Sequence, residues 1–235
     1  MKQLIILIAA LVFTGSYAQT NDQLKKHFEA YYTTMKNQGD VQGVINAITH
    51  LNVLEPNTAR QDTLAYLYLS EGNYMQALNT IGVEKNESDS DINVEVKALA
   101  LKNLNQPKMA LEHFDVLFKR KPTPFLAYEM ADMEIQTNNL EGAKAHIEYG
   151  MANVKDDMKR AFYETQQPYE TSLKAAFTYL NGLLIYRQDP KANIDKALKE
   201  MNAALDIDPN FNLAKVSRQA LEGQKAQQAA AAKNN

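Results

Sequence analysis

The sequence predicts an all-α fold: a right-handed α-solenoid of about five helix–turn–helix repeats followed by a C-terminal capping helix. The main observation is a period, because small or aliphatic residues recur every 33 positions, at Val44, Ala77, Ala110 and Ala143. A larger apolar residue follows each of them four positions later, on the same helix face: Ile48, Ile81, Phe114 and Ile147. A period of this length is typical of stacked supersecondary units, in which each unit covers its neighbour's apolar face.

The first 18 residues form a separate segment. Lys2 precedes an apolar run from Leu4 to Phe13, and Ser16-Tyr17-Ala18 is a small-x-small sequence. This pattern is typical of a secretory signal peptide cleaved after Ala18. The apolar run is shorter than the roughly 18 residues that a transmembrane helix needs. We therefore expect a periplasmic or secreted chain that does not span a membrane after cleavage.

The composition narrows the possible functions. The 235 residues include no cysteine, which excludes disulfides, thiol catalysis and a lipid-anchoring cysteine behind the signal peptide. The formal charge of -3 argues against nucleic acid as a partner, because nucleic-acid-binding domains usually present a basic surface. A hydrophobic content of 45% is enough for a folded chain.

The second repeat shows the helix pair most clearly. Its first helix, Thr58–Glu71, carries apolar residues at helical spacing and ends at Gly72-Asn73, as helices with a C-terminal glycine do. Its second helix, Tyr74–Val83, follows directly. The other pairs are Asp22–Asn37 with Val41–Leu54, Asp91–Asn103 with Pro107–Lys119, and Pro124–Thr137 with Leu140–Val154.

The fifth copy of the pattern is out of register. It contains Ala197, Met201 and Pro209, and the distance from Ala143 exceeds one period by 21 residues. The repeat domain over residues 19–225 therefore has units near 22–56, 58–89, 91–122, 124–155 and 169–209. An insertion near 155–177, a cap at 211–224 and a flexible Ala/Gln-rich tail at 226–235 complete the chain.

The insertion keeps helical spacing at Val154, Met158, Ala161 and Phe162, which predicts an added or extended helix. Two alternatives stay open for this segment, since it either packs on the repeats or projects as a functional arm.

Three further details concern the last third of the chain. We expect Pro168 to open a long helix that reaches Arg187, and Asp189-Pro190 to be an N-cap followed by proline at the first helical position. In the capping helix, we expect Leu213, Val216 and Leu221 to face inward.

The repeats resemble the tetratricopeptide repeat (TPR) family. Its units pair two antiparallel helices, with alanine in the second helix, then an aromatic or aliphatic residue, then proline. The stretch Lys196–Phe211 carries this pattern, as do Leu64-Ala65, Tyr68 and Gly72-Asn73-Tyr74 in the second repeat. The resemblance covers about residues 22–225 and implies a stack of helix pairs that binds other proteins.

The chain also departs from the family. Where the family has tryptophan in the first helix, this chain has Phe28, Gln61, Val94 and Ala127. Where the family has glycine, it has Tyr32, Ala65, Ala98 and Ala131. The period is 33, where the family has 34. Ankyrin repeats also have 33 residues, but the chain contains nothing similar to their Thr-Pro-Leu-His motif.

Catalytic and metal-binding signals are missing. His113 and His146 occupy equivalent places in successive repeats, and we interpret them as a partly exposed pair on the outer face, not as metal ligands. Asp89-Ser90-Asp91 imitates the start of a calcium loop, but Ala100 stands where a bidentate glutamate is required, so an inter-repeat turn that caps the next helix explains it better. No phosphate-binding loop or hydrolase motif occurs. We expect no cofactor and no enzymatic activity.

In the TPR family the first helices of the repeats form a concave binding face, and the resemblance implies which side chains point outward there. These candidate partner-binding residues are mostly acidic or aromatic: Asp62, Tyr66, Leu69, Glu95, Leu99, Lys102, Phe125, Tyr128, Asp132 and Ile135. The family's carboxylate clamp for acidic tails is not reproduced, because Asp62 and Glu95 stand where its positive charge would be. We therefore predict that the partner is a protein or extended peptide, apolar with basic residues. Alternatively, Tyr66, Leu69 and Leu99 pack between units.

Three functions remain open at this point. The first is an exported bacterial scaffold or adaptor that binds a partner protein in its concave groove. The second is a structural component that docks onto a larger envelope complex by its convex face or by the inserted segment. The third is a small-ligand-binding or catalytic module with a pocket made by the insertion.

Overall fold

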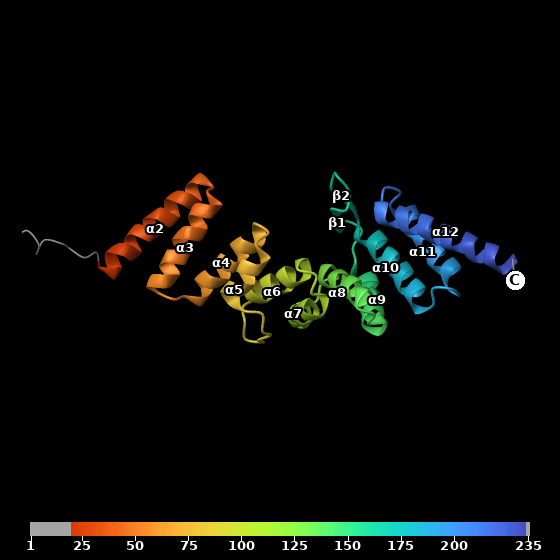
Figure 1. Ribbon diagram of the computed structural model, residues 1–235, viewed down its shortest axis with the longest axis horizontal. Helices are drawn as coiled ribbons and strands as arrows, with labels where there is room; N and C mark the ends of the chain where they lie inside the picture. Colours follow the sequence, from red (N-terminus) through yellow and green to blue (C-terminus); the bar gives the residue numbers. More distant parts are fainter. Residues whose placement is uncertain (1–19, 234–235) are drawn as a thin grey trace, which may run out of the picture. The chain divides into compact units, whose positions relative to one another are not determined.

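The structure is a computed structural model that describes residues 20–233 (Figure 1). The predicted signal peptide and the last two residues of the predicted tail lie outside the described residues. The sequence predicts a single repeat domain, whereas the contacts divide the chain after Ile81 into two compact units. Unit 1 ends at Ile81 and unit 2 begins at Gly82.

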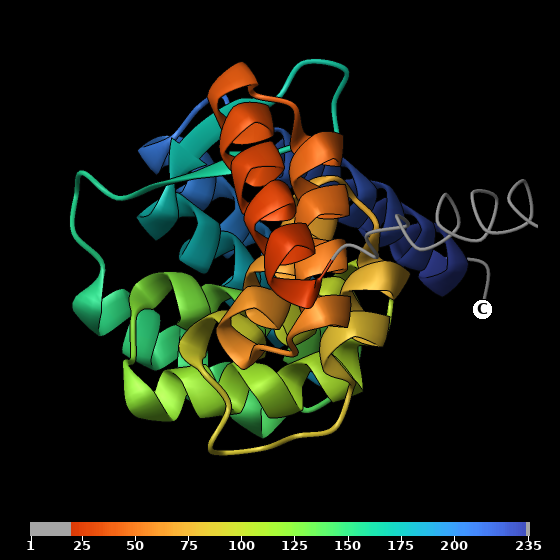
Figure 2. The same ribbon diagram turned by 90° about the vertical axis from the view of Figure 1, so that its left-hand side faces the viewer.

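Within the described residues, unit 1 contains two helix pairs. The first is α2 (Asn21–Gln38) with α3 (Val41–Leu54), and the second is α4 (Thr58–Ser70) with α5 (Tyr74–Ile81). Figure 2 shows α2 and α3 side by side, running in opposite directions. Thr20 opens α2 with a reciprocal capping box to Gln23. A small core forms between the pairs from Val44, Ile45, Ile48 and Leu64.

Unit 2 begins with two more helix pairs. These are α6 (Asp91–Asn103) with α7 (Pro107–Arg120), and α8 (Pro124–Gln136) with α9 (Leu140–Asn153). Ser90 accepts the backbone N–H of Asn93 at 3.1 Å, so the interpretation of this segment as a turn that caps the next helix is confirmed.

The second half of unit 2 holds the remaining elements. They are β1 (Lys159–Phe162), β2 (Tyr169–Ser172), α10 (Leu173–Gln188), α11 (Ile194–Ile207) and α12 (Asn212–Lys233).

A left-handed residue ends the first helix of each of the first four pairs. These residues are Gly39, Gly72, Asn105 and Asn138, with φ angles of 72°, 73°, 57° and 61°. At each turn, the N–H of the left-handed residue bonds back three residues and the next N–H bonds back five, as Asn105 does to Lys102 and Gln106 to Leu101. This is the Schellman pattern, which glycine and asparagine adopt most readily. The short turns are therefore encoded locally in each repeat.

The repeated small residues lie where helices touch. Ala77, Ala110, Ala143 and Ala197 are fully buried, and Val44 is 9% exposed. A side chain with a single methyl group allows the paired helix backbones to approach closely. The all-α helical-repeat fold that the sequence predicts is confirmed.

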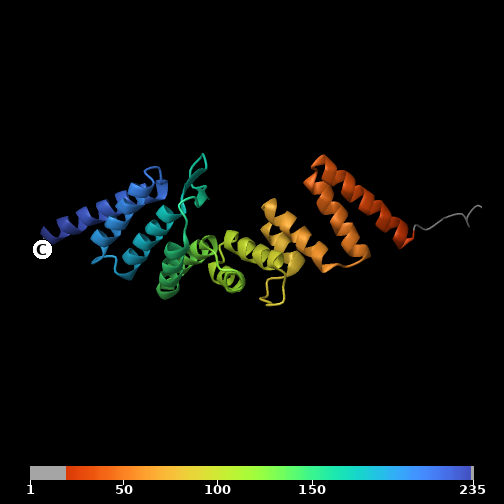
Figure 3. The same cartoon turned by 180° about the vertical axis from the view of Figure 1, so that it is seen from behind.

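The prediction of an added helix in the insertion is wrong. Helix α9 ends at Asn153, and β1 and β2 form an antiparallel hairpin in which Phe162 pairs with Tyr169 (Figure 3). Arg160 and Phe162, two residues apart, both contact Tyr128 of α8, which fits the two-residue period of a strand. The apolar residues Val154, Met158, Ala161 and Phe162 also fit helical spacing, because so short a run of apolar residues does not distinguish the period of a helix from that of a strand. Phe162 is buried, so the hairpin packs on unit 2.

Two other local expectations are wrong in the same region. Pro168 lies in the hairpin loop, and α10 begins only at Leu173. The Asp189 carboxylate accepts the backbone N–H groups of Lys191 and Ala192, so it caps a turn, and α11 begins later, at Ile194.

Helix α12 continues beyond the predicted cap to Lys233. Leu221 faces inward as expected, but Val216 is 54% exposed because no further helix covers that side of α12 in the described chain. None of the helices in residues 20–233 has the length and apolar character needed to cross a bilayer.

The large core of unit 2 joins α8, α9, the hairpin and α10 to α12. Its centre is aromatic, since Phe177 and Phe211 are fully buried and Tyr128 packs edge-on against Phe177. Gly150 of α9 faces this ring, and a Cβ at Gly150 would lie 2.0 Å from the Phe177 ring carbon Cζ. This glycine is therefore required for the approach of α9 to α10.

We predict that Gly150→Ala destabilises the fold by about 2 kcal/mol, because the added methyl group overpacks a close contact. The change would be measured as a lower midpoint of urea unfolding, monitored by circular dichroism. The matched control is Gly223→Ala in α12, where nothing lies within 4 Å of the added Cβ. The control is expected to be neutral or stabilising by up to about 1 kcal/mol through helix propensity. Equal midpoints for the two variants would contradict the prediction.

Candidate functional site

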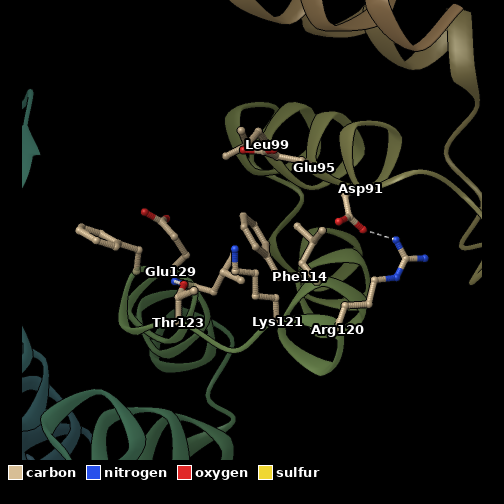
Figure 4. Close-up of a pocket in the computed structure, with 11 residues that line it drawn as sticks. Asp91, Glu95, Leu99, Phe114, Arg120, Lys121, Thr123 and Glu129 are labelled. Atoms are coloured by element: carbon tan, nitrogen blue, oxygen red, sulfur yellow. Dashed lines mark hydrogen bonds and ion pairs between the residues drawn. The ribbon is translucent and has the colours of Figure 1, made fainter. Parts of the chain in front are cut away.

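The main hollow of unit 2 lies between α6 and α8 and has a volume of about 480 Å³ (Figure 4). Helix α6 forms one wall, α8 forms the opposite wall, and α7 lies beneath them. The lining residues are Asp91, Glu95, Leu99, Phe114, Leu117, Arg120, Lys121, Thr123, Phe125, Leu126 and Glu129. The hollow therefore lies between the first helices of two consecutive repeats.

The floor of the hollow is apolar. Phe114 and Leu117 come from α7, and Leu99 and Leu126 add aliphatic surface from the two walls. Phe114 is the large residue that follows Ala110 by one helical turn, and it is 2% exposed. The same residue pattern that packs the repeat therefore also provides the floor of the hollow.

The rim carries both paired and unpaired charges. Arg120 donates to the Asp91 carboxylate at 2.7 Å, drawn as a dashed line in Figure 4, and to the carbonyl oxygen of Glu87 at 2.5 Å. Within residues 20–233, no ion pair reaches Glu95 or Lys121. The two unpaired charges belong to different elements, with Glu95 on α6 and Lys121 just after α7. The rim therefore presents one free charge of each sign.

Glu129 is both part of the α8 wall and the centre of an ion-pair network. It accepts hydrogen bonds from Lys102 of α6 and from Arg160 of β1. Burial alone would raise the pKa of the Glu129 carboxyl, but the charges of Lys102 and Arg160 outweigh it and hold the pKa below its usual range. Glu129 therefore stays ionised and links the hollow to the hairpin.

Arg160 extends this network into the aromatic core. Its guanidinium lies 4.2 Å from the ring centroid of Tyr128 and 5.3 Å from that of Phe162. Stacking of this kind is favourable for a partly desolvated arginine. Because Arg160 and Phe162 belong to the same strand, the hairpin is held over α8 through Arg160 by one ion pair, to Glu129, and one cation–π contact, to Tyr128.

Asp132 lies one turn beyond Glu129 on α8. It accepts a hydrogen bond from Gln136 at 3.0 Å. Burial raises the pKa of Asp132, and the nearby Glu129 carboxylate adds to the shift. Asp132 is not among the residues that line the hollow.

The ten predicted site residues separate into three groups. Glu95, Leu99 and Phe125 line the hollow, and Lys102 and Asp132 lie beside it. Tyr66 and Leu69 belong to α4 of unit 1, where Tyr66 is 53% exposed.

The third group is buried, contrary to the expected outward orientation. Tyr128, Ile135 and Asp62 are 2%, 3% and 6% exposed. The hairpin residues Arg160 and Phe162 cover Tyr128, which the repeat pattern could not indicate because the insertion has no counterpart in other repeats.

Several lining residues were missed by the sequence-based prediction. Phe114, Leu117, Arg120 and Lys121 come from or just after the second helix of a pair, whereas the prediction considered first helices alone. One signal for the floor was available, since the residue four positions after each repeated small residue is apolar.

Unit 1 has two smaller hollows in the corresponding place, between α2 and α4. Both are lined by Tyr32 and Thr63, and their volumes are about 240 and 230 Å³. The predicted residues Asp62, Tyr66 and Leu69 do not line either of them.

The histidine interpretation needs one correction. His113 is 2% exposed, because the loop before α6 covers it and its Nε2 donates to the carbonyl oxygen of Val83 at 3.0 Å. Burial lowers the pKa of His113, and the neighbouring Lys97 adds to the effect. His146 contacts the Glu134 carboxylate at 2.7 Å. In the described part of the chain, no three potential metal-ligating side chains group together.

Comparison with solved structures identifies the fold as TPR-like. A tetratricopeptide repeat protein from Parabacteroides merdae aligns with a TM-score of 0.64 and 15% identity, covering 89% of this chain and 76% of that one. YrrB, described as a TPR protein with an unusual peptide-binding site, aligns with a TM-score of 0.62 and 14% identity, covering 82% and 90%. MamA aligns with a TM-score of 0.58 and 13% identity, covering 80% and 93%. At these identities the likeness concerns the fold alone.

Neither a scan against protein-family models nor a search of the curated proteins finds a match for this sequence.

We predict that Glu129→Gln lowers the free energy of unfolding by about 2 kcal/mol at neutral pH, since it leaves two partly buried cations without their anion. The folded-state pKa of Glu129 lies below that of the unfolded chain, so the carboxylate stabilises the fold fully at neutral pH. This contribution disappears as the pH falls through the folded-state pKa. The difference between wild type and variant should therefore shrink in acid, as measured by urea unfolding from pH 7 to about pH 3.

The matched control for this pH series is Glu95→Gln. Glu95 is exposed and has no ion pair within residues 20–233, so its removal should change stability little at any pH. If the difference in the free energy of unfolding between wild type and Glu129→Gln stays constant with pH, the stability of the network does not depend on ionisation of Glu129.

Proposed function

We propose that this protein is an exported scaffold that binds an extended segment of a partner protein in the hollow between α6 and α8. The observation that carries the proposal is the hollow itself, with an apolar floor and a rim on which Glu95 and Lys121 have no partner charge in the described chain. Apolar side chains of the partner would contact Leu99, Leu117 and Leu126, which are partly exposed, above the buried Phe114. Such contacts, enclosed by a polar rim, are typical of protein-binding sites.

The charges of the rim favour binding of a charged partner segment. Asp91 is paired with Arg120, and Glu129 is paired with Lys102 and Arg160. These groups already have their counter-charges, which leaves Glu95 and Lys121 as the charges of the rim that a partner can pair with. A basic residue of the partner would pair with Glu95, and an acidic group near the other end would pair with Lys121.

The relatives in fold support binding in general. YrrB, which has the same fold, is described as having an unusual peptide-binding site.

Export is the second part of the proposal. It is supported by the apolar run Leu4–Phe13 behind Lys2 and by the small-x-small sequence that ends at Ala18. We propose a periplasmic or secreted location for the mature chain.

We predict that panning a random dodecapeptide phage library on the immobilised protein enriches peptides that combine apolar residues with a basic residue. In fluorescence anisotropy with a labelled enriched peptide, Phe125→Ala should weaken binding about tenfold, as the loss of an exposed aromatic contact does. Glu95→Lys should shift a second round of panning from basic toward acidic peptides, because like charges repel.

The control for Phe125→Ala is Met151→Ala. The two side chains are similarly exposed, at 43% and 42%, but Met151 lies on α9 outside the hollow. Binding that is equally reduced by both variants, or enriched peptides with no charge preference, would argue against the hollow as the site.

We further predict that residues 1–30, fused to alkaline phosphatase without its own signal, produce active enzyme. This reporter requires disulfides, which form after export and not in the cytosol. Leu7→Arg interrupts the apolar run and should abolish activity at equal expression. Equal activity with and without Leu7→Arg would contradict the export prediction.

A further inference from the structure

The loop before α6, residues 82–90, is attached to unit 2 through its backbone. His113 donates to the carbonyl oxygen of Val83, and Lys97 donates to that of Glu84 at 3.0 Å. Lys97 also pairs with the Asp89 carboxylate at 2.6 Å. These contacts use carbonyl groups at the start of the loop and the carboxylate near its end. The side chains in the middle are therefore left on the surface.

Asn86, Glu87 and Ser88 occupy this exposed middle. A turn is closed by the Asp89 N–H, which donates to the carbonyl oxygen of Asn86 at 3.2 Å. The side-chain oxygen of Asn86 accepts from the Ser88 N–H at 3.0 Å and from the Ser88 hydroxyl at 2.8 Å. A backbone N–H can only donate, so the amide of Asn86 has its oxygen inside the turn and its nitrogen outside.

The sequence of this turn is that of an acceptor for N-linked glycosylation. Asn86-Glu87-Ser88 has the form Asn-x-Ser, and it is the single Asn-x-Ser/Thr triplet in the 235-residue sequence. Glu84 stands two residues before the asparagine. The triplet thus coincides with an exposed loop whose asparagine nitrogen makes no hydrogen bond within residues 20–233.

We propose that Asn86 is a glycosylation site, modified by an oligosaccharyltransferase that uses a polyprenyl-pyrophosphate-linked oligosaccharide. The proposal rests on the export part of the proposed function, because such donors face the compartment outside the cytosol. It is independent of binding in the hollow.

The chemistry follows from the groups in the turn. A bond forms between Nδ2 of Asn86 and C1 of the sugar, and the bond between C1 and the pyrophosphate oxygen breaks. Polyprenyl pyrophosphate leaves with the electron pair, and a basic group of the transferase takes the proton from Nδ2. The Ser88 hydroxyl donates to the amide oxygen, which makes the remaining N–H protons more acidic and favours this proton loss.

The position of the site relates it to the hollow. Glu87 is the neighbour of Asn86, and its carbonyl oxygen accepts from Arg120, which lines the rim and pairs with Asp91. A glycan at Asn86 would begin next to this rim. It would stand outside the hollow, because Asn86 is not among the lining residues.

The test uses a bacterial host that carries a transferase specific for Asp/Glu-x-Asn-x-Ser/Thr and its lipid-linked oligosaccharide. The chain is expressed with a heterologous export signal in place of residues 1–18, so a failure of the native signal does not affect the result. A C-terminal tag with a known acceptor sequence reports which molecules met the transferase. In molecules with a glycosylated tag, the tryptic peptide Asn86–Lys97 should carry the mass of the oligosaccharide.

Three variants separate the acceptor from its surroundings. Asn86→Gln and Ser88→Ala should each abolish the mass increase, and Ser88→Ala does so with the asparagine still present. Glu87→Gln changes the variable position of the triplet and should leave the modified fraction unchanged, while circular dichroism shows that all variants are folded. An unmodified Asn86 in wild-type molecules with a glycosylated tag would overturn the proposal.

Discussion

The helical repeat depends on one backbone constraint, the left-handed residue that ends the first helix of a pair. In each of the first four pairs, the repeated small residue follows it by five positions: Gly39 and Val44, Gly72 and Ala77, Asn105 and Ala110, Asn138 and Ala143. The turn fixes where the second helix begins, so it also fixes which residue faces the first helix. Because few side chains tolerate this conformation, the turn position is restricted to glycine or asparagine. A local requirement of the turn thereby sets the packing of the pair.

The constraint is not repeated in the second half of unit 2. No residue with positive φ follows Asn138 within the described chain, and the turn between α10 and α11 is closed by the Asp189 side chain instead. The hairpin inserted between α9 and α10 is held by side chains, through Arg160 to Glu129 and through Thr171 to Asp208. Glu129 also forms part of the hollow, so one carboxylate connects the position of the hairpin with the shape of the hollow.

The sequence allowed prediction of what is encoded within one repeat. The helix pairs and most of the turns follow from periodicity and turn chemistry, and the resemblance to the TPR family implied the exposed positions of Glu95 and Phe125. Tyr128 and His113 were placed incorrectly because segments without a counterpart in other repeats cover them, the hairpin in one case and the loop before α6 in the other. The hairpin was mistaken for a helix because four apolar residues fit both periods. Burial of a side chain by a segment distant in the sequence leaves no periodic pattern in that sequence.

If a partner segment binds in the hollow as proposed, the pairing of charges there determines which segments are selected. Of the charged residues that line the hollow, Asp91, Arg120 and Glu129 are paired with opposite charges. They therefore repel neither positively nor negatively charged groups strongly. Glu95 and Lys121 are the remaining charges, and both border an apolar floor where water is partly displaced when a ligand binds. An interaction with either charge is strengthened as water leaves, and so is a repulsion. In the proposed complex, selectivity would therefore come from the rejection of segments whose charges are in the reverse order, because their binding would desolvate like-charged pairs at Glu95 and Lys121.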